Sequence, residues 1–153
     1  MEIKVARYRN YPYIVNYDNG SSVKKYRWNG SKGSKHEVKS IPKEVVDHLV
    51  MNSQCFRQGE LKIIDDTEEA KETIDNLDEK EEYEANTHSF EEAEKILKGN
   101  YKKMEKELQN ITVHDEKKFF IEVAKEINLD SATKQKILAD WYGVDRETLF
   151  SDE

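Results

Sequence analysis

Residues 64–84 read IDDTEEAKETIDNLDEKEEYE and separate two halves of different character. Residues 1–64 carry 12 Lys and Arg against 6 Asp and Glu, a net charge of +6, whereas residues 65–99 carry 4 against 14, a net charge of −10. The pattern before the acidic run is strand-like, aromatic and basic, and the pattern after it is helical. The sequence therefore predicts an α+β chain with a β-rich module at 1–64, an acidic helical linker at 65–88 and a helical domain at 89–153.

The composition describes a polar protein with small local cores. Of 153 residues, 37% are charged and 36% are hydrophobic, a balance shifted towards charge relative to typical domains. A module of about 60 residues buries only about 60% of its unfolded surface, so we expect support from an oligomer or a partner. There is no apolar run of about 18 residues and no leader pattern, and we expect a soluble, non-secreted protein. The single cysteine, Cys55, excludes an internal disulfide.

The N-terminal module shows the alternation typical of β-strands. Strands are expected at 3–8, 11–17, 23–28, 36–41 and 61–64. Asn19-Gly20 predicts a hairpin turn, and the segment from Ser31 to Ser34 extends a second turn. A short amphipathic helix is expected at 42–52. Together these signals predict a β-meander that forms a small antiparallel sheet or open barrel with one helix against it.

The acidic run predicts a helix with a narrow apolar stripe, which consists of Ala70, Ile74 and Leu77. Such a helix buries little by itself, so it is either a solvated linker or an element that docks on another surface.

The C-terminal part predicts a helical bundle or hairpin unit. Ser89 and Glu92 predict a capping box. Apolar residues between 90 and 111 follow heptad spacing, but the run is shorter than three to four clean heptads, which favours an internal bundle seam over a coiled coil. Further helices are expected from about 112 and from about 131, and Asp145 is expected to cap a last short turn.

No group of residues predicts a reaction. Two S-x-x-K matches, Ser40–Lys43 and Ser131–Lys134, lack the motifs that accompany a serine–lysine nucleophile. The four histidines are scattered without metal-ligand spacing, and the acidic run lacks the glycine of a calcium loop. The sequence therefore predicts a protein that is not an enzyme and that uses no cofactor or metal.

A nucleic-acid-binding module is the alternative function. Aromatic rings alternate with cations in the predicted strands, which is the composition of a single-strand-binding sheet. Strands also favour aromatic residues for packing, and basic residues protect exposed strand edges. The cations that would contact phosphates are Arg7, Arg9, Lys24, Lys25 and Arg27.

Residues 133–149 have the spacing of a helix-turn-helix, with Gly143 at the turn. The candidate recognition helix, residues 145–153, carries Asp145, Glu147, Asp152 and Glu153 against one cation, Arg146. Phosphates would repel such a helix, so duplex recognition is disfavoured.

Two stretches carry a family resemblance. One comprises Tyr26–Gly30, Glu37–Val46 and Phe56–Leu61, and the other is Phe119–Phe150. Both resemble small proteins encoded among the head and tail genes of tailed phages that infect low-GC Gram-positive bacteria. The resemblance implies a non-enzymatic virion component near the capsid or the head–tail junction, and it transfers no active-site residues.

We therefore expect a phage structural or assembly protein that acts by protein–protein contact, in the virion and in the host cytoplasm during assembly. The β-rich module would dock on the capsid or neck, and the helical domain would self-associate or contact another subunit. The expected partners are other virion proteins and further copies of the chain, with nucleic acid as the alternative and no membrane. The candidate contact residues, for each of which a core role is the competing interpretation, are Tyr11, Tyr13, Tyr26, Trp28, Trp141, Leu149 and Phe150.

Overall fold

The structure is a computed structural model that describes residues 1–32 and 35–150. It separates the chain into two compact units, Met1–Thr87 and His88–Glu153. The first unit contains antiparallel sheets together with short helices, and the described part of the second is helical. The predicted α+β class with a C-terminal helical unit is therefore confirmed.

Parts of two sequence predictions lie outside the described residues. These are Gly33 and Ser34 of the second turn, and Asp152 and Glu153 of the candidate recognition helix. Among the helices that the structure does describe, none has the length and apolar character needed to cross a membrane.

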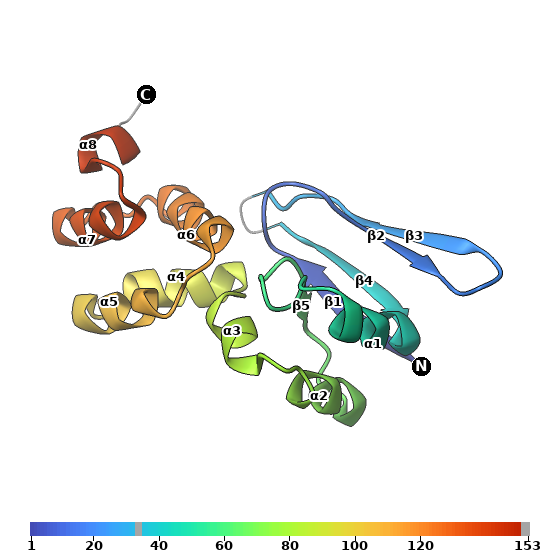
Figure 1. The fold of residues 1–153 in the computed structure, drawn as a ribbon. Helices are drawn as coiled ribbons and strands as arrows, with labels where there is room; N and C mark the ends of the chain where they lie inside the picture. The colour runs from blue at the N-terminus through green and yellow to red at the C-terminus, as the bar shows by residue number, and fades with distance from the viewer. Residues whose placement is uncertain (33–34, 151–153) are drawn as a thin grey trace. The chain divides into compact units, whose positions relative to one another are not determined.

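The first unit contains two antiparallel sheets (Figure 1). One has the strand order β4-β1-β5, and the other is the hairpin β2–β3. The strands are β1 (Glu2–Arg7), β2 (Tyr13–Asp18), β3 (Val23–Trp28), β4 (Glu37–Pro42) and β5 (Lys62–Ile63). Helix α1 (Lys43–Asn52) contributes to the core through Val45, Val46 and Leu49, which join Ile3, Val5, Ile41 and Ile63 of the strands.

The predicted meander connectivity is wrong, because β1 pairs with β4 and β5 rather than with β2. Contacts of the connecting residues divert the chain from the sheet. The Arg7 Nε donates to the carbonyl oxygen of Tyr11 at 3.0 Å, and the N–H of Ser31 donates to the carbonyl oxygen of Arg9 at 2.8 Å. Pro12, which has no N–H for a strand ladder, directly precedes β2. The chain therefore leaves the first sheet before β2 begins.

The acidic run, predicted as either a linker or a docking element, packs against the core of the first unit. It contains α2 (Glu68–Asp75) and α3 (Lys80–Ala85), and it buries Ala70 and Tyr83 in the same core as the strands. On one continuous helix these two side chains would point about 140° apart, because each residue turns the helix by about 100°. The break between α2 and α3 allows both side chains to face the core.

The second unit is built from helices joined by short connections. They are α4 (Phe90–Lys98), α5 (Tyr101–Gln109), α6 (His114–Glu126), α7 (Ala132–Tyr142) and α8 (Arg146–Leu149). The predicted capping box forms at the start of α4. Ser89 Oγ accepts from the N–H of Glu92 at 3.1 Å, and Glu92 Oε1 accepts from the N–H of Ser89 at 2.9 Å.

The heptad seam is divided between α4 and α5. Helix α4 ends at Gly99, and the Asn100 side chain accepts from the first N–H groups of α5. The seam residues Leu97, Met104 and Leu108 are nevertheless buried within the second unit. These three seam residues therefore line the interior of the helical unit, as the bundle interpretation expected, whereas Tyr101 is 45% exposed.

Candidate protein-contact surface

Arg7 and Arg9 lie inside the first unit, where they bind Glu60. Arg9 Nη1 donates to Glu60 Oε1 at 2.6 Å, and Arg7 Nη1 lies 3.5 Å from the same oxygen. Arg7 Nη1 also donates to the Glu60 carbonyl oxygen at 2.6 Å. The two arginines are 0% and 3% exposed. Both are therefore structural cations, and the nucleic-acid alternative loses these two phosphate contacts.

Tyr11 and Tyr13 pack on this buried cluster. The guanidinium carbon of Arg7 lies 4.4 Å from the ring centroid of Tyr11 and 5.4 Å from that of Tyr13. The Tyr11 hydroxyl donates to Glu60 Oε1 at 3.1 Å. Burial raises the pKa of Tyr13 to about 12. The two half-buried rings therefore stabilise the end of β1 and are directed inward.

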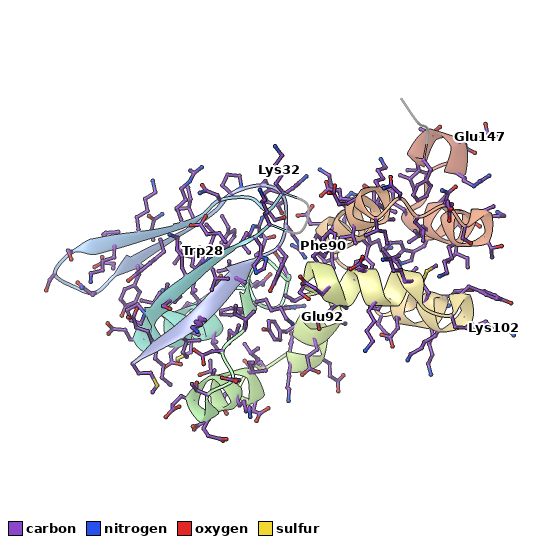
Figure 2. The ribbon with its side chains drawn as sticks, turned by 180° about the vertical axis from the view of Figure 1, so that it is seen from behind. Trp28, Lys32, Phe90, Glu92, Lys102 and Glu147 are labelled. Carbon is purple, nitrogen blue, oxygen red and sulfur yellow. The ribbon has the colours of Figure 1, made fainter. Side chains whose placement is uncertain are left out.

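The register of the hairpin places its aromatic side chains on one face and two of its cations, Lys25 and Arg27, on the other. Directly opposite residues share a face of an antiparallel ladder, and Tyr13 lies opposite Trp28, and Val15 opposite Tyr26. Trp28, labelled in Figure 2, is 0% exposed and donates from Nε1 to the carbonyl oxygen of Val5 at 2.9 Å. Trp28 is therefore a core residue and not part of a contact surface, and Tyr26 beside it is half-buried.

The other side of the hairpin is solvent-exposed along its whole length. We call this surface the hairpin face, and its residues are Ile14, Asn16, Asp18, Val23, Lys25 and Arg27. Ile14 and Val23 are 41% and 63% exposed. Arg27 lies opposite Ile14 in the ladder, and Lys24 is exposed on the other side near the turn. No other described strand pairs with either hairpin strand, so both outer edges present peptide groups.

A second surface was not predicted from the sequence. It is a cavity of about 180 Å³, lined by Val50, Met51, Ser53, Gln54, Phe56, Arg57, Leu77, Asp78, Glu79 and Tyr83, and we call it the acidic groove. Met51 is 81% exposed at this site. In the sequence, Met51 lies beside the apolar stripe of α1 and not within it. An apolar residue outside the stripe is the signal that could have identified this surface.

Two carboxylates share one guanidinium at the acidic groove. Arg57 Nε pairs with Glu79 and, at 2.7 Å, with Glu82. The Arg57 guanidinium lowers the pKa of Glu82, whereas loss of hydration and a hydrogen bond with Glu82 raise the pKa of Glu79. Asp78 adds a third carboxylate to the groove. The site therefore keeps excess negative charge.

Residues 56–61, which carry part of the family resemblance, hold the first unit together. The Gln58 carbonyl oxygen accepts from Arg9 Nη2 at 2.7 Å. Gly59 has φ +75°, and a Cβ at this position would overlap the carbonyl oxygen of Asn86. The motif is therefore explained by packing between the start of the chain and the end of α3.

Cys55, Ser131 and Lys134 make contacts that stabilise their own units. Cys55 is 2% exposed, and burial raises the pKa of its thiol to about 11, so the thiol is protonated at neutral pH. Lys134 Nζ donates to the Leu97 carbonyl oxygen at 2.7 Å, and Ser131 Oγ accepts from the Lys134 N–H. Within residues 1–32 and 35–150, no three His, Cys, Asp or Glu side chains are grouped to hold a metal ion.

Trp141 connects the helices of the second unit. Its Nε1 donates to the Leu108 carbonyl oxygen at 2.9 Å, and its ring centroid lies 6.2 Å from that of Phe120. Leu149 is buried and Phe150 is half-buried. Trp141 and Leu149 are therefore packing residues. This agrees with the core role that competed with their prediction as contact residues. Helix α8 has four residues, too short for the recognition helix of a helix-turn-helix.

Family models match both parts of the chain. The YonA N-terminal domain matches residues 1–79, and the YonA C-terminal domain matches residues 89–148. No curated protein and no solved structure matches the chain. The first match alone covers more than half of the 153 residues. The chain therefore belongs to the YonA family, a phage-associated protein family, which confirms the predicted association with phages.

Proposed function

We propose that this chain is a structural or assembly protein of a phage particle that acts by protein–protein contact at the capsid or the head–tail junction. It would reside in the virion, and in the host cytoplasm during assembly, as a non-enzymatic component without a cofactor. The observation that carries the proposal is the hairpin face, where exposed apolar and cationic side chains lie between two strand edges that no described strand pairs.

The chemistry of this face supports protein contact. Arginine and exposed apolar residues are typical of protein interfaces, and a free strand edge can accept a strand from a partner. Ile14 and Val23 remain exposed although the hairpin already buries its aromatic face against the core. A partner that covers the hairpin face would remove this apolar surface from water.

The test is the recovery of the protein in phage particles purified on a density gradient from infected cells. We expect the wild-type protein to co-sediment with particles or assembly intermediates, and Lys25→Glu/Arg27→Glu to reduce its recovery about tenfold, because a partner matched to cations would meet acids. The control is Lys102→Glu/Lys103→Glu, which makes the same charge change on α5, where Lys102 extends into solvent (Figure 2). Absence from every particle fraction, or normal recovery of the hairpin variant, would overturn the proposal.

Nucleic-acid binding through the hairpin is the second candidate, because Lys24, Lys25 and Arg27 are all exposed on β3. Base stacking would need exposed rings beside these cations, whereas Tyr26 and Trp28 face the core. Phosphate contacts predict DNA binding that weakens steeply as salt increases. If single- and double-stranded DNA fail to bind at low salt, this candidate is removed.

A further inference from the structure

Opposite charges are separated within the first unit. Hairpin residues 13–28 carry 3 Lys and Arg against 1 Asp, whereas residues 65–84 carry 11 Asp and Glu against 2 Lys. Among the described residues, Lys25 forms no ion pair, and Arg27 contacts the Asn29 side chain at 3.3 Å rather than a carboxylate. The cations of the hairpin face are thus available to an acidic partner.

The acidic groove offers the complementary charge. Arg57 forms ion pairs with both Glu79 and Glu82, and Asp78 adds a further carboxylate. The carboxylates of the groove therefore outnumber its cation. A second cation brought to this site would pair with the carboxylate that Arg57 satisfies least. Burial of both partners by a contact would strengthen this attraction, since water and salt screen it less there.

The two surfaces also match in their apolar parts. The hairpin face exposes the branched side chains of Ile14 and Val23, and the groove is lined by the exposed Met51 together with Leu77 and Phe56. A cavity of about 180 Å³ is large enough for one aliphatic side chain, since a cavity of about 150 Å³ binds benzene.

One chain cannot bring its own hairpin face to its own groove. The inner face of the hairpin covers the core through Val15 and Trp28, so the hairpin face is directed away from the unit. The turn between β2 and β3 also lies at the end of the unit away from α2 and α3 (Figure 1). A contact between the two surfaces must therefore join two chains.

We propose that the first unit self-associates head to tail, with the hairpin face of one copy docked in the acidic groove of a second copy. Lys25 and Arg27 meet the carboxylates of Asp78 and Glu79 in this contact, and Val23 enters the cavity that Met51 lines. The two patches differ, so the contact is heterologous and repeats into a ring or an open row. This inference rests on the proposed function and names the partner of its contact surface.

The test is solution mass by light scattering on the full chain, over a range of concentrations and at two salt levels. We expect a mass that rises with concentration at low salt and returns towards that of one chain at about 0.5 M salt, where screening shortens the range of charge attraction. A protein that stays monomeric at all concentrations in low salt overturns the proposal. This arm uses the wild-type chain and does not depend on the folding of any variant.

Two variants block the two sides of the contact separately. Lys25→Glu/Arg27→Glu changes the hairpin face, and Met51→Lys/Asp78→Lys changes the groove. All four side chains are exposed, and far-ultraviolet circular dichroism checks that each variant is folded. Each variant alone should be monomeric. Their equimolar mixture should give twice the mass of one chain and no more, because it pairs one intact hairpin face with one intact groove.

Other results assign the contact elsewhere. Self-association of either variant at the wild-type level, or a mixture that stays monomeric, overturns the head-to-tail contact. If the wild type is monomeric but enters phage particles, and Lys25→Glu/Arg27→Glu reduces its recovery there, the head-to-tail contact is overturned and the proposed function stands. Self-association without any recovery in particles would overturn the proposed function and leave the head-to-tail contact standing. Mass that increases only when DNA is added would assign the hairpin to nucleic acid and overturn both proposals.

Discussion

Arg9 and Glu60 form a 2.6 Å ion pair inside the first unit, although 51 positions separate them in the sequence. Arg9 uses its other terminal nitrogen to reach the carbonyl oxygens of Gln58 and Asn86. One side chain thereby connects the end of β1, the turn before β5 and the end of α3.

Replacing the carboxylate should therefore destabilise the whole first unit. Glu60→Gln removes the carboxylate that pairs with the buried Arg7 and Arg9, and we expect a loss of about 3 kcal/mol in the free energy of unfolding. Urea denaturation measures this loss. The control Glu81→Gln changes the same group on the exposed side of α3 and should stay within about 0.5 kcal/mol of the wild type. Equal effects of both substitutions would contradict a special role for Glu60.

Gly59 and Gly20 provide a matched pair for the close packing against Asn86. Both have positive φ, +75° and +91°, but a Cβ at Gly20 meets nothing within 4 Å. Gly20→Ala should cost about 1–2 kcal/mol for its left-handed backbone alone. Gly59→Ala should cost about 1–3 kcal/mol more, because the backbone of Asn86 must move. Thermal unfolding compares the two variants, and similar losses would rule out the overlap.

Cys55 predicts a loss of stability at alkaline pH. In the unfolded chain its thiol ionises near pH 9.0, whereas burial holds the pKa at about 11 in the folded protein. Between these values the unfolded chain binds fewer protons, so the stability from the neutral thiol is complete below about pH 9 and is lost as pH rises towards 11. Two pKa units correspond to about 2–3 kcal/mol.

The measurement is the unfolding free energy of the wild type and of Cys55→Ala at several pH values. The advantage of the wild type over the variant should shrink as pH rises from about 9 to about 11. A constant difference would show that the thiol is not buried in its neutral form. The native thiol should also react slowly with a disulfide reagent at neutral pH and quickly in urea.

We expect a substitution of Trp141 to lower the stability of the second unit and to leave contacts with partners unchanged. Trp141→Phe keeps an aromatic ring but removes the Nε1–H that donates to Leu108, and we expect a loss of about 1 kcal/mol. Tyr142→Phe is the matched control, since its ring stacks on His114 and should remain there. A Trp141→Phe variant with unchanged melting temperature and weaker recovery in phage particles would instead place Trp141 in an interface.

The elements that the sequence predicted well are those decided by neighbouring residues. The strand at 23–28 follows from its composition and the Asn19-Gly20 turn, and the capping box at Ser89 needs only residues within one helical turn. Asp145 likewise caps the last helix as expected, by accepting from the N–H of Thr148. Local hydrogen bonds leave a local pattern of residue types.

The elements that it missed depend on distant partners. Arginines in an alternating strand predict an exposed position, because Arg is almost never buried unless it is paired. The pairing of Arg7 and Arg9 with Glu60 joins residues far apart in the sequence and therefore leaves no short-range signal. The acidic run gave no sign of its break, since only packing of Tyr83 against the strands requires one. The groove likewise combines residues from α1 and from the α2–α3 connection, so no single stretch announces it.

The hydrogen bond from Arg9 to the Asn86 carbonyl spans 77 positions of the chain. At synthesis rates of about 5–20 residues per second, about 4–15 s pass between the addition of Arg9 to the chain and the addition of Asn86. The β2–β3 hairpin can form during this interval, because its two strands are neighbours in sequence. The order of translation therefore makes both hairpin strands available first and the hydrogen bond between Arg9 and Asn86, which closes the first unit, last.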